Sequence, residues 1–282
     1  MNWLTDNKIP IDDAAEAVFD WLLINAGWLF DGLAVAMEWL IDAILWVLQT
    51  PHPLIVIAVF GALTWAIQRN WKTPLLIVLG FLFILNQDYW EETTESLTLV
   101  LSACVVCMAI GVPIGIAMSK SNTMQRITIP ILDMLQTLPT FVYLIPLIFL
   151  FSVTESKLYG IAIILYAIVP VIRLTDLGIR LVDKDVIEAA DAFGMSNRQK
   201  LLGVQIPLAL PNIMAGINQT IMMSLAMVVI ASMIGAKGLG VEVLNGIARL
   251  EVGRGLVGGI GIVVMAIILI GITQGFAKSQ QR

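Results

Sequence analysis

The chain has 282 residues, of which 59% are apolar and only 13% are charged, and its mean hydropathy is +0.90. A soluble fold of this length cannot cover so much apolar surface, so the composition excludes a soluble globular protein and predicts an all-α polytopic membrane protein. The net charge of −5 says little about partners, because the side of the membrane on which charges lie matters more than their sum. The opening MNWLTDNKIP lacks a basic region and a small-residue cleavage site, so we expect no secretory signal peptide.

The sequence contains no recognisable catalytic motif. It has no Walker A sequence, no nucleophile elbow and no cluster of metal ligands, so we predict neither an enzyme nor a metal site, and no cofactor bound by this chain. Cys104 and Cys107 lie three residues apart on one face of an apolar helix. This setting favours core packing over a redox or metal-binding role.

The first predicted element covers residues 11–49, an apolar helix rich in Trp with polar residues at steps of four and seven. The residues at these steps are Glu16, Asp20, Gly27, Asp31, Glu38, Asp42 and Gln49. Burying a carboxylate at mid-bilayer costs about 2.5–3.5 kcal/mol, so we expect residues 1–50 to form an amphipathic or scaffold segment at the membrane interface. The alternative is a span whose acidic stripe faces protein.

Apolar runs predict about seven spans after this segment. Residues 51–93 contain two of them, in a hairpin whose turn carries Arg69 and Lys72 and is therefore expected on the cytoplasmic side. Residues 94–276 form the predicted core, and residues 277–282 a cytoplasmic tail. The expected spans are 54–67, 74–85, 96–119, 127–151, 159–179, 215–234 and 255–276.

Three features refine the core. Gly111 and Gly115 form a GxxxG pattern, which predicts a face for close helix packing. Residues 127–151 contain three prolines, including Pro139, and predict either a kinked helix beside a pathway or simple bending in a packed bundle. The glycine-rich residues 235–254 predict a turn followed by a short amphipathic helix on the outer side.

A polar interval within the loop 180–212 predicts a helix–turn–helix that projects from the membrane. Asp185 and Glu188 have the spacing of a capping box, and Gly194 suits the turn after the first helix. Ser196 and Gln199 repeat the capping-box spacing. The second helix is expected to end at Pro207. Small side chains on the first helix would let another protein approach closely, as a docking surface requires.

Glu188, Ala189 and Ala190, followed by Gly194 and by the segment VQIP at 204–207, resemble the EAA loop of ABC importer permeases. The resemblance implies a type I ABC importer, in which two permease copies form the pathway in the bacterial cytoplasmic (inner) membrane. It also implies a pair of ATPase subunits that bind ATP and Mg, and a substrate-binding protein that delivers the cargo. The four named residues would then be the ATPase-coupling site. No nucleic-acid partner is expected.

Four further stretches, 136–146, 170–175, 215–220 and 228–234, resemble permeases of the glycine betaine/proline betaine family, which includes choline and trimethylamine-N-oxide importers. The chain is therefore expected to be the permease subunit for a small quaternary ammonium or N-oxide osmolyte. With no binding-protein domain expected on this chain, a separate partner would supply recognition. One alternative is import of another small solute, such as an amino acid. A second is a passive osmolyte channel or secondary carrier.

Polar and aromatic residues of the proline-containing helix and a neighbouring helix form the predicted translocation path. They are Gln136, Thr137, Thr140, Tyr143, Asn218, Thr220 and Ser224. A methylated ammonium is attracted to aromatic faces, and Tyr143 offers one. The alternative for each residue is an interhelical hydrogen bond.

Asp133 and Arg173 lie about 9 Å from the cytoplasmic ends of their predicted spans, at 1.5 Å per residue. Unpaired charges are unfavourable at such positions, so we predict an ion pair between them near an inner gate. Asp176, three residues from Arg173 on the same helix, is the competing partner.

Overall fold

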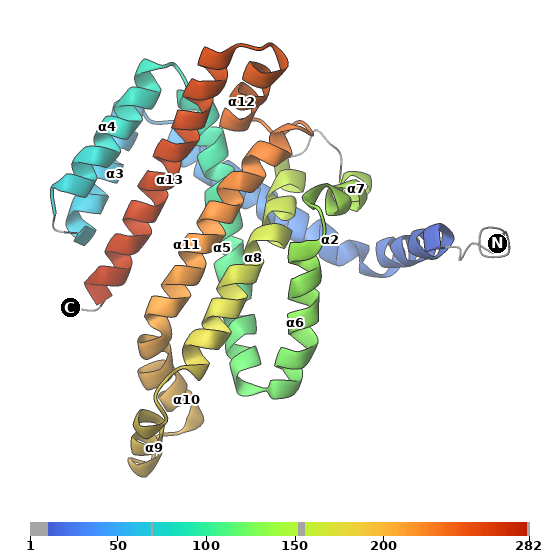
Figure 1. Ribbon diagram of the computed structural model, residues 1–282, viewed down its shortest axis with the longest axis vertical. Helices are drawn as coiled ribbons and strands as arrows, with labels where there is room; N and C mark the ends of the chain where they lie inside the picture. Colours follow the sequence, from blue (N-terminus) through green and yellow to red (C-terminus); the bar gives the residue numbers. More distant parts are fainter. Residues whose placement is uncertain (1–10, 69, 152–155, 281–282) are drawn as a thin grey trace, which may run out of the picture.

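The structure is a computed structural model that describes residues 11–68, 70–151 and 156–280, and all of their regular structure is helical (Figure 1). The all-α prediction is therefore confirmed. The helices are α2 (Ile11–Gln49), α3 (Pro53–Gln68), α4 (Lys72–Asn86), α5 (Trp90–Lys120), α6 (Asn122–Thr137), α7 (Thr140–Leu150), α8 (Ser156–Arg180), α9 (Lys184–Ala192), α10 (Asn197–Lys200), α11 (Ile206–Ser232), α12 (Leu239–Ala248) and α13 (Val252–Gln280), and a π-helical segment, Leu201–Gln205, joins α10 to α11.

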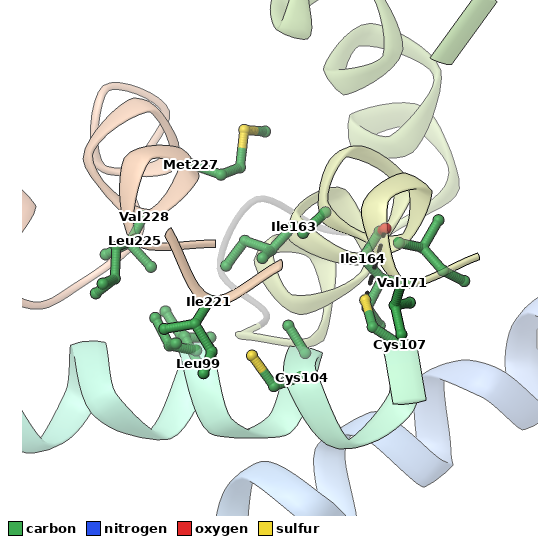
Figure 2. Packing of buried hydrophobic residues seen from close by; sticks show 14 of the residues in the cluster. Leu99, Cys104, Cys107, Ile163, Ile164, Val171, Ile221, Leu225, Met227 and Val228 are labelled. Atoms are coloured by element: carbon green, nitrogen blue, oxygen red, sulfur yellow. Dashed lines mark hydrogen bonds between the residues drawn. The ribbon is translucent and has the colours of Figure 1, made fainter. Parts of the chain in front are cut away.

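The core of the bundle consists of α5, α8 and α11, which pack along one another (Figure 1). Helix α8 is largely apolar and is buried along most of its length, as expected for a central helix. Figure 2 shows the contact region, where Leu99 of α5 and Ile163 of α8 lie among Ile221 and Leu225 of α11. Residues distant in sequence thus form one continuous core.

The GxxxG pattern lies at the interface of α5 with α8, which confirms the predicted close-packing face. A Cβ atom at Gly111 would collide with the Val171 side chain. At Gly115 it would lie 2.7 Å from the carbonyl oxygen of Ile172, a backbone atom that cannot rotate away. Glycine at both positions lets the two helix backbones approach closely.

Cys104 and Cys107 are buried free thiols of α5, so the core-packing prediction is confirmed. The Cys104 Sγ lies 3.9 Å from the Ser224 Oγ of α11, and Cys107 points to the Ile164 carbonyl of α8 at 3.9 Å (Figure 2). Both sulfur atoms therefore fill gaps between core helices.

The predicted N-terminal helix is present as α2, whose later part packs on α5 and α8 through Met37, Ile41 and Leu48. Its acidic positions are exposed on the single chain, and Glu38 forms an ion pair with Lys157 of α8 at 3.4 Å. Helix α3 follows at an angle of 102° to α2. Whether α2 lies at the interface or spans the membrane stays a prediction.

The predicted hairpin is present as α3 and α4, which pack on each other and on α13 through a separate apolar cluster around Phe81. These helices have 16 and 15 residues, so each is shorter than a straight span of about 20 residues. Within the described ranges, four helices are long and apolar enough to cross a membrane, or up to six if two bent pairs each count as one span. The predicted number of about seven spans is not confirmed.

The segment 127–151 is not one kinked helix, contrary to prediction. Helices α6 and α7 meet at 99°, and the break falls at Leu138 and Pro139. Leu138 is extended, with φ −65° and ψ 132°, as the residue before a proline prefers. Pro130 and Pro146 lie inside α6 and α7 without ending them.

The turn and short helix predicted for residues 235–254 are present, and the short helix is α12, which follows α11. Gly235 and Gly238 have φ values of 112° and 115°, a conformation that favours glycine. The Leu239 N–H donates to the Ser96 Oγ of α5 at 2.9 Å, and this bond fixes the start of α12. After α12 the chain returns through α13, which continues to Gln280, so the described part of the predicted 277–282 tail is helical.

Candidate coupling site and translocation path

The helix–turn–helix of the polar loop is formed by α9 and α10, at the end of the bundle away from α12 (Figure 1). The predicted capping box of Asp185 and Glu188 is wrong. Asp183 is the N-cap, and its side chain accepts a hydrogen bond from the Asp185 N–H at 3.0 Å. Asp185 lies instead in the first turn of α9, where its negative charge interacts favourably with the helix dipole.

The turn between the two helices follows the predicted chemistry. Gly194 has φ +71°, and the Met195 N–H donates to the Ala190 carbonyl at 3.1 Å, which closes the end of α9. Ser196 and Gln199 form the predicted capping box: the Ser196 N–H donates to Gln199 Oε1 at 2.9 Å, and the Gln199 N–H to Ser196 Oγ at 3.4 Å. Lys200 and Asp191 form an ion pair at 2.5 Å that ties α10 to α9.

The exposed face of α9 includes Glu188 and Ala189, as a docking surface requires, whereas Ala190 is buried beneath it. Ala190 therefore supports the hairpin from inside rather than presenting a docking surface on this chain. Phe193 was not among the predicted site residues, yet its side chain is 88% exposed at the tip of the hairpin. A large apolar residue directly before Gly194, inside an otherwise polar loop, was the available signal.

Pro207 does not end the second helix, contrary to prediction. Residues 197–232 form one continuous helical run, because the π-helical segment Leu201–Gln205 joins α10 to α11. The Ile206 N–H donates to the Leu201 carbonyl, five residues back. This wider turn accommodates Pro207, the next residue, which has no N–H. Helices α9 and α10 with the turn between them are called the coupling hairpin below. Its second arm, α10, is thus the direct extension of core helix α11.

The first arm of the coupling hairpin, α9, follows the end of core helix α8, where a polar network holds α8 to its neighbours. Asp176 is buried and accepts hydrogen bonds from Arg180 Nε at 2.8 Å and from Gln125 Nε2 of α6 at 2.7 Å. Arg180 also donates to the Met118 carbonyl of α5 at 2.7 Å. The network joins α5, α6 and α8 next to the hairpin. Its sequence signal was the spacing of four between the acid and the base on one helix.

The predicted ion pair of Asp133 and Arg173 is present and links α6 to α8. The competing partner, Asp176, is occupied by Arg180. The pair is confirmed as a contact, whereas its role in a gate stays a prediction.

The structure separates the predicted path residues into two groups. Thr220 and Ser224 are fully buried within the chain, where Thr220 donates to the Ala167 carbonyl of α8 at 2.8 Å and Ser224 to the Thr220 carbonyl at 2.8 Å. Asn218 accepts a hydrogen bond from Thr273 of α13 at 2.5 Å. These contacts correspond to the alternative interpretation, hydrogen bonding in helix interfaces, rather than to an open path.

The other group lies at the α6–α7 break. Gln136 and Thr137 are exposed, Thr137 donates to the Asp133 carbonyl at 2.8 Å, and Thr140 is half-buried. The side chain of Tyr143 lies outside the described residues. Gln136, Thr137 and part of Thr140 are therefore accessible on the surface of one chain.

A cavity of about 760 Å³ lies between α2, α3, α5, α11 and α13. Apolar residues such as Val47, Phe60, Val105 and Ile217 line it, so it offers a charged solute few polar contacts. Among the described residues, no group of three or more His, Cys, Asp or Glu is placed to hold a metal ion.

Residues 109–282 match the family described as binding-protein-dependent transport system inner membrane component. The chain is 42% identical over 268 residues to the glycine betaine transport system permease protein OpuAB of Bacillus subtilis, with 95% of this chain and 94% of that protein covered. It is 40% identical over 274 residues to the glycine betaine/proline betaine transport system permease protein ProW of Escherichia coli, covering 97% of this chain and 77% of that protein. The trimethylamine N-oxide transport system permease protein TmoV of Ruegeria pomeroyi is 33% identical over 215 residues, which cover 76% of this chain and 32% of that protein.

These similarities, together with the all-helical fold, show that the chain belongs to the ABC importer permeases of the betaine family and is a multi-pass inner-membrane transport protein.

Proposed function

We propose that this permease imports glycine betaine or a closely related methylated osmolyte, driven by ATP that separate ATPase subunits bind with Mg and hydrolyse. The observation that carries the proposal is the coupling hairpin, which exposes Glu188 and Ala189 and continues through α10 into core helix α11. The names of the relatives, which include glycine betaine and trimethylamine N-oxide permeases, support the cargo class.

The hairpin has the connections needed to convert ATPase movement into movement of membrane helices. A force on α10 acts on α11 without an intervening loop, and the Lys200–Asp191 ion pair moves α9 with α10. Helix α9 follows α8 directly, and the Asp176–Arg180 network ties that end of α8 to α5 and α6. Docking of an ATPase subunit around the hairpin would therefore act on three core helices together.

The remaining proposed partners are a second copy of this chain and a substrate-binding protein. Burial of Thr220 and Ser224 inside one chain supports a path formed between two copies rather than through a single one. Exposure of Gln136 and Thr137 beside the α6–α7 break supports a position for them on that shared surface. Selection of the cargo would then rest largely on the binding protein.

The test is a tagged purification from native membranes, with wild type beside Glu188→Arg and with Glu91→Arg, an exposed acid at the start of α5, as the matched control. We expect an ATPase subunit to co-purify with wild type and the control and to be lost from Glu188→Arg, together with uptake of labelled glycine betaine. Glycine betaine uptake at the wild-type rate by Glu188→Arg would instead favour a channel or secondary carrier. Competition by an excess of an amino acid, but not by proline betaine, would favour the other-solute alternative.

A further inference from the structure

A second, small cavity lies at the end of the bundle opposite the coupling hairpin. The starts of α5 and α8 and the turn after α11 line it, with two apolar residues of α2 on another side. These segments are distant from α9 and α10, which follow the other end of α8 and precede α11 (Figure 1). If the hairpin docks on a cytoplasmic ATPase, this cavity lies toward the side from which a binding protein delivers cargo.

The cavity has one acidic and one basic side chain in its wall. Glu95 of α5 is half-buried, and Lys237 lies in the turn before α12. Across the described ranges, the ion pairs closer than 4.0 Å involve other residues, so Glu95 and Lys237 form no direct ion pair with each other or with a third group. A half-buried carboxylate without a directly bound counter-charge is unfavourable, so Glu95 and Lys237 can each bind a ligand group of opposite charge.

Uncharged groups of the same cavity add two contacts. Thr98 is 1% exposed, and its hydroxyl has no hydrogen-bond partner, although leaving such a group unpaired costs about 1–3 kcal/mol. Tyr159 of α8 donates through its hydroxyl to the Ile234 carbonyl at 3.3 Å, which holds its aromatic ring in the wall. An aromatic ring attracts a methylated ammonium, and the Thr98 hydroxyl can donate to a carboxylate.

The size and charges of the cavity define its ligand. Its volume of about 130 Å³ is enough for a small solute and too little for a peptide. Because the cavity wall carries both signs of charge, a zwitterion suits it better than a simple cation or anion. We propose that this cavity is a transit site for a methylated zwitterion such as glycine betaine, with the ammonium at Glu95 and Tyr159 and the carboxylate at Lys237 and Thr98.

This proposal rests on the proposed function and adds a binding site on the permease itself. It is tested by equilibrium binding of labelled glycine betaine and labelled choline to the full-length permease in lipid nanodiscs, without the binding protein. The variants are Lys237→Met, Glu95→Gln and Thr98→Val, with Lys237→Arg as the conservative control. Glu91→Gln is the matched control, because Glu91 is an exposed acid one turn before Glu95 and does not line the cavity.

We expect saturable binding of glycine betaine by wild type, Lys237→Arg and Glu91→Gln. Lys237→Met should weaken glycine betaine binding by about tenfold or more, and should not weaken the binding of choline, which has no carboxylate. Glu95→Gln should weaken the binding of both ligands. Thr98→Val should weaken glycine betaine alone without lowering the unfolding temperature, because it removes a hydroxyl that has no partner in the protein.

Two outcomes overturn the site. One is the absence of saturable glycine betaine binding by folded wild-type permease, and the other is equal binding by wild type and all three cavity variants. Uptake of glycine betaine by cells that contain the complete wild-type transporter separates this failure from failure of the proposed function. If uptake is present while the site fails, the import function stands. If wild-type cells show no such uptake, the proposed function itself is wrong.

Discussion

Arg173 of α8 forms its ion pair with Asp133 of α6, although Asp176 lies only three residues away on its own helix. Asp176 pairs with Arg180, one turn further along α8. The two basic residues of this half of α8 therefore have separate acidic partners. The first pair joins α8 to the helix that precedes the α6–α7 break, and the second lies next to the coupling hairpin.

Exchanging the charges at 133 and 173 tests whether the first pair matters for transport. Asp133→Arg or Arg173→Asp alone places two like charges side by side, and we expect each to lower the uptake rate about fivefold or more. The double exchange rebuilds the pair and should restore most of the rate, as measured with labelled glycine betaine at equal protein levels.

The matched control combines Arg173→Asp with Asp176→Arg. Because Asp176 is bound by Arg180 and not by Arg173, this combination should not restore transport. Rescue by the control but not by the 133–173 exchange would contradict the assigned pairing.

Gly194→Val should abolish transport while the protein still reaches the membrane. The space around Gly194 is open, so the penalty comes from its φ of +71°, which a β-branched residue cannot adopt without strain. Gly194→Asn should retain most activity because Asn tolerates this conformation. Gly203→Ala is a second control, since its new methyl would meet only the Met195 Cε at 3.6 Å. Full transport by Gly194→Val would defeat the coupling role of the turn.

Gly115→Ala should lower the free energy of unfolding by about 1–3 kcal/mol, because the new methyl would lie 2.7 Å from the Ile172 carbonyl oxygen. Gly259→Ala on α13 is the control, since nothing lies within 4 Å of its added Cβ. Thermal unfolding in detergent measures the difference. Equal unfolding temperatures for Gly115→Ala and Gly259→Ala would show that α5 and α8 can move apart to accept the methyl group at little cost in stability.

Most local chemistry was predicted well from the sequence because each such signal depends on residues within one or two helical turns, although the N-cap of α9 is Asp183 and not Asp185. The Ser196–Gln199 capping box, the turn at Gly194 and the GxxxG face are all of this kind. The ion pair of Asp133 and Arg173 was also predicted, since few other partners exist for charges inside apolar helices.

Features that depend on packing between distant helices were not predictable in the same way. Of the three prolines between residues 127 and 151, only Pro139 marks a break, and the sequence offers no sign of which one will do so. Thr220 and Ser224 likewise resemble path residues in sequence, because a polar side chain in an apolar span serves an interhelical hydrogen bond or a solute equally well. Pro207 continues a helix because a π-helical turn precedes it, which no local pattern indicated.

The contact between α12 and α13 makes stability depend on pH through Glu242. Arg254 donates two hydrogen bonds to this buried carboxylate, at 2.6 and 3.1 Å, and these hold the pKa of Glu242 below its ordinary value of 4.5 despite the opposing effect of burial. Asn245 and Tyr89 also act on it as hydrogen-bond donors. The carboxylate form is therefore favoured in the folded protein more than in the unfolded chain.

A lowered pKa in the folded state stabilises the protein above the unfolded pKa, and this contribution is lost as the pH falls through the folded value. Glu242→Gln should therefore lower the free energy of unfolding by about 1–3 kcal/mol near neutral pH, and the difference from wild type should shrink below about pH 4.5. Thermal unfolding of both proteins between neutral and acidic pH measures it, with Glu91→Gln as a control for an exposed acid. A difference that stays constant or grows on acidification would show that the Glu242 charge is not what stabilises this contact.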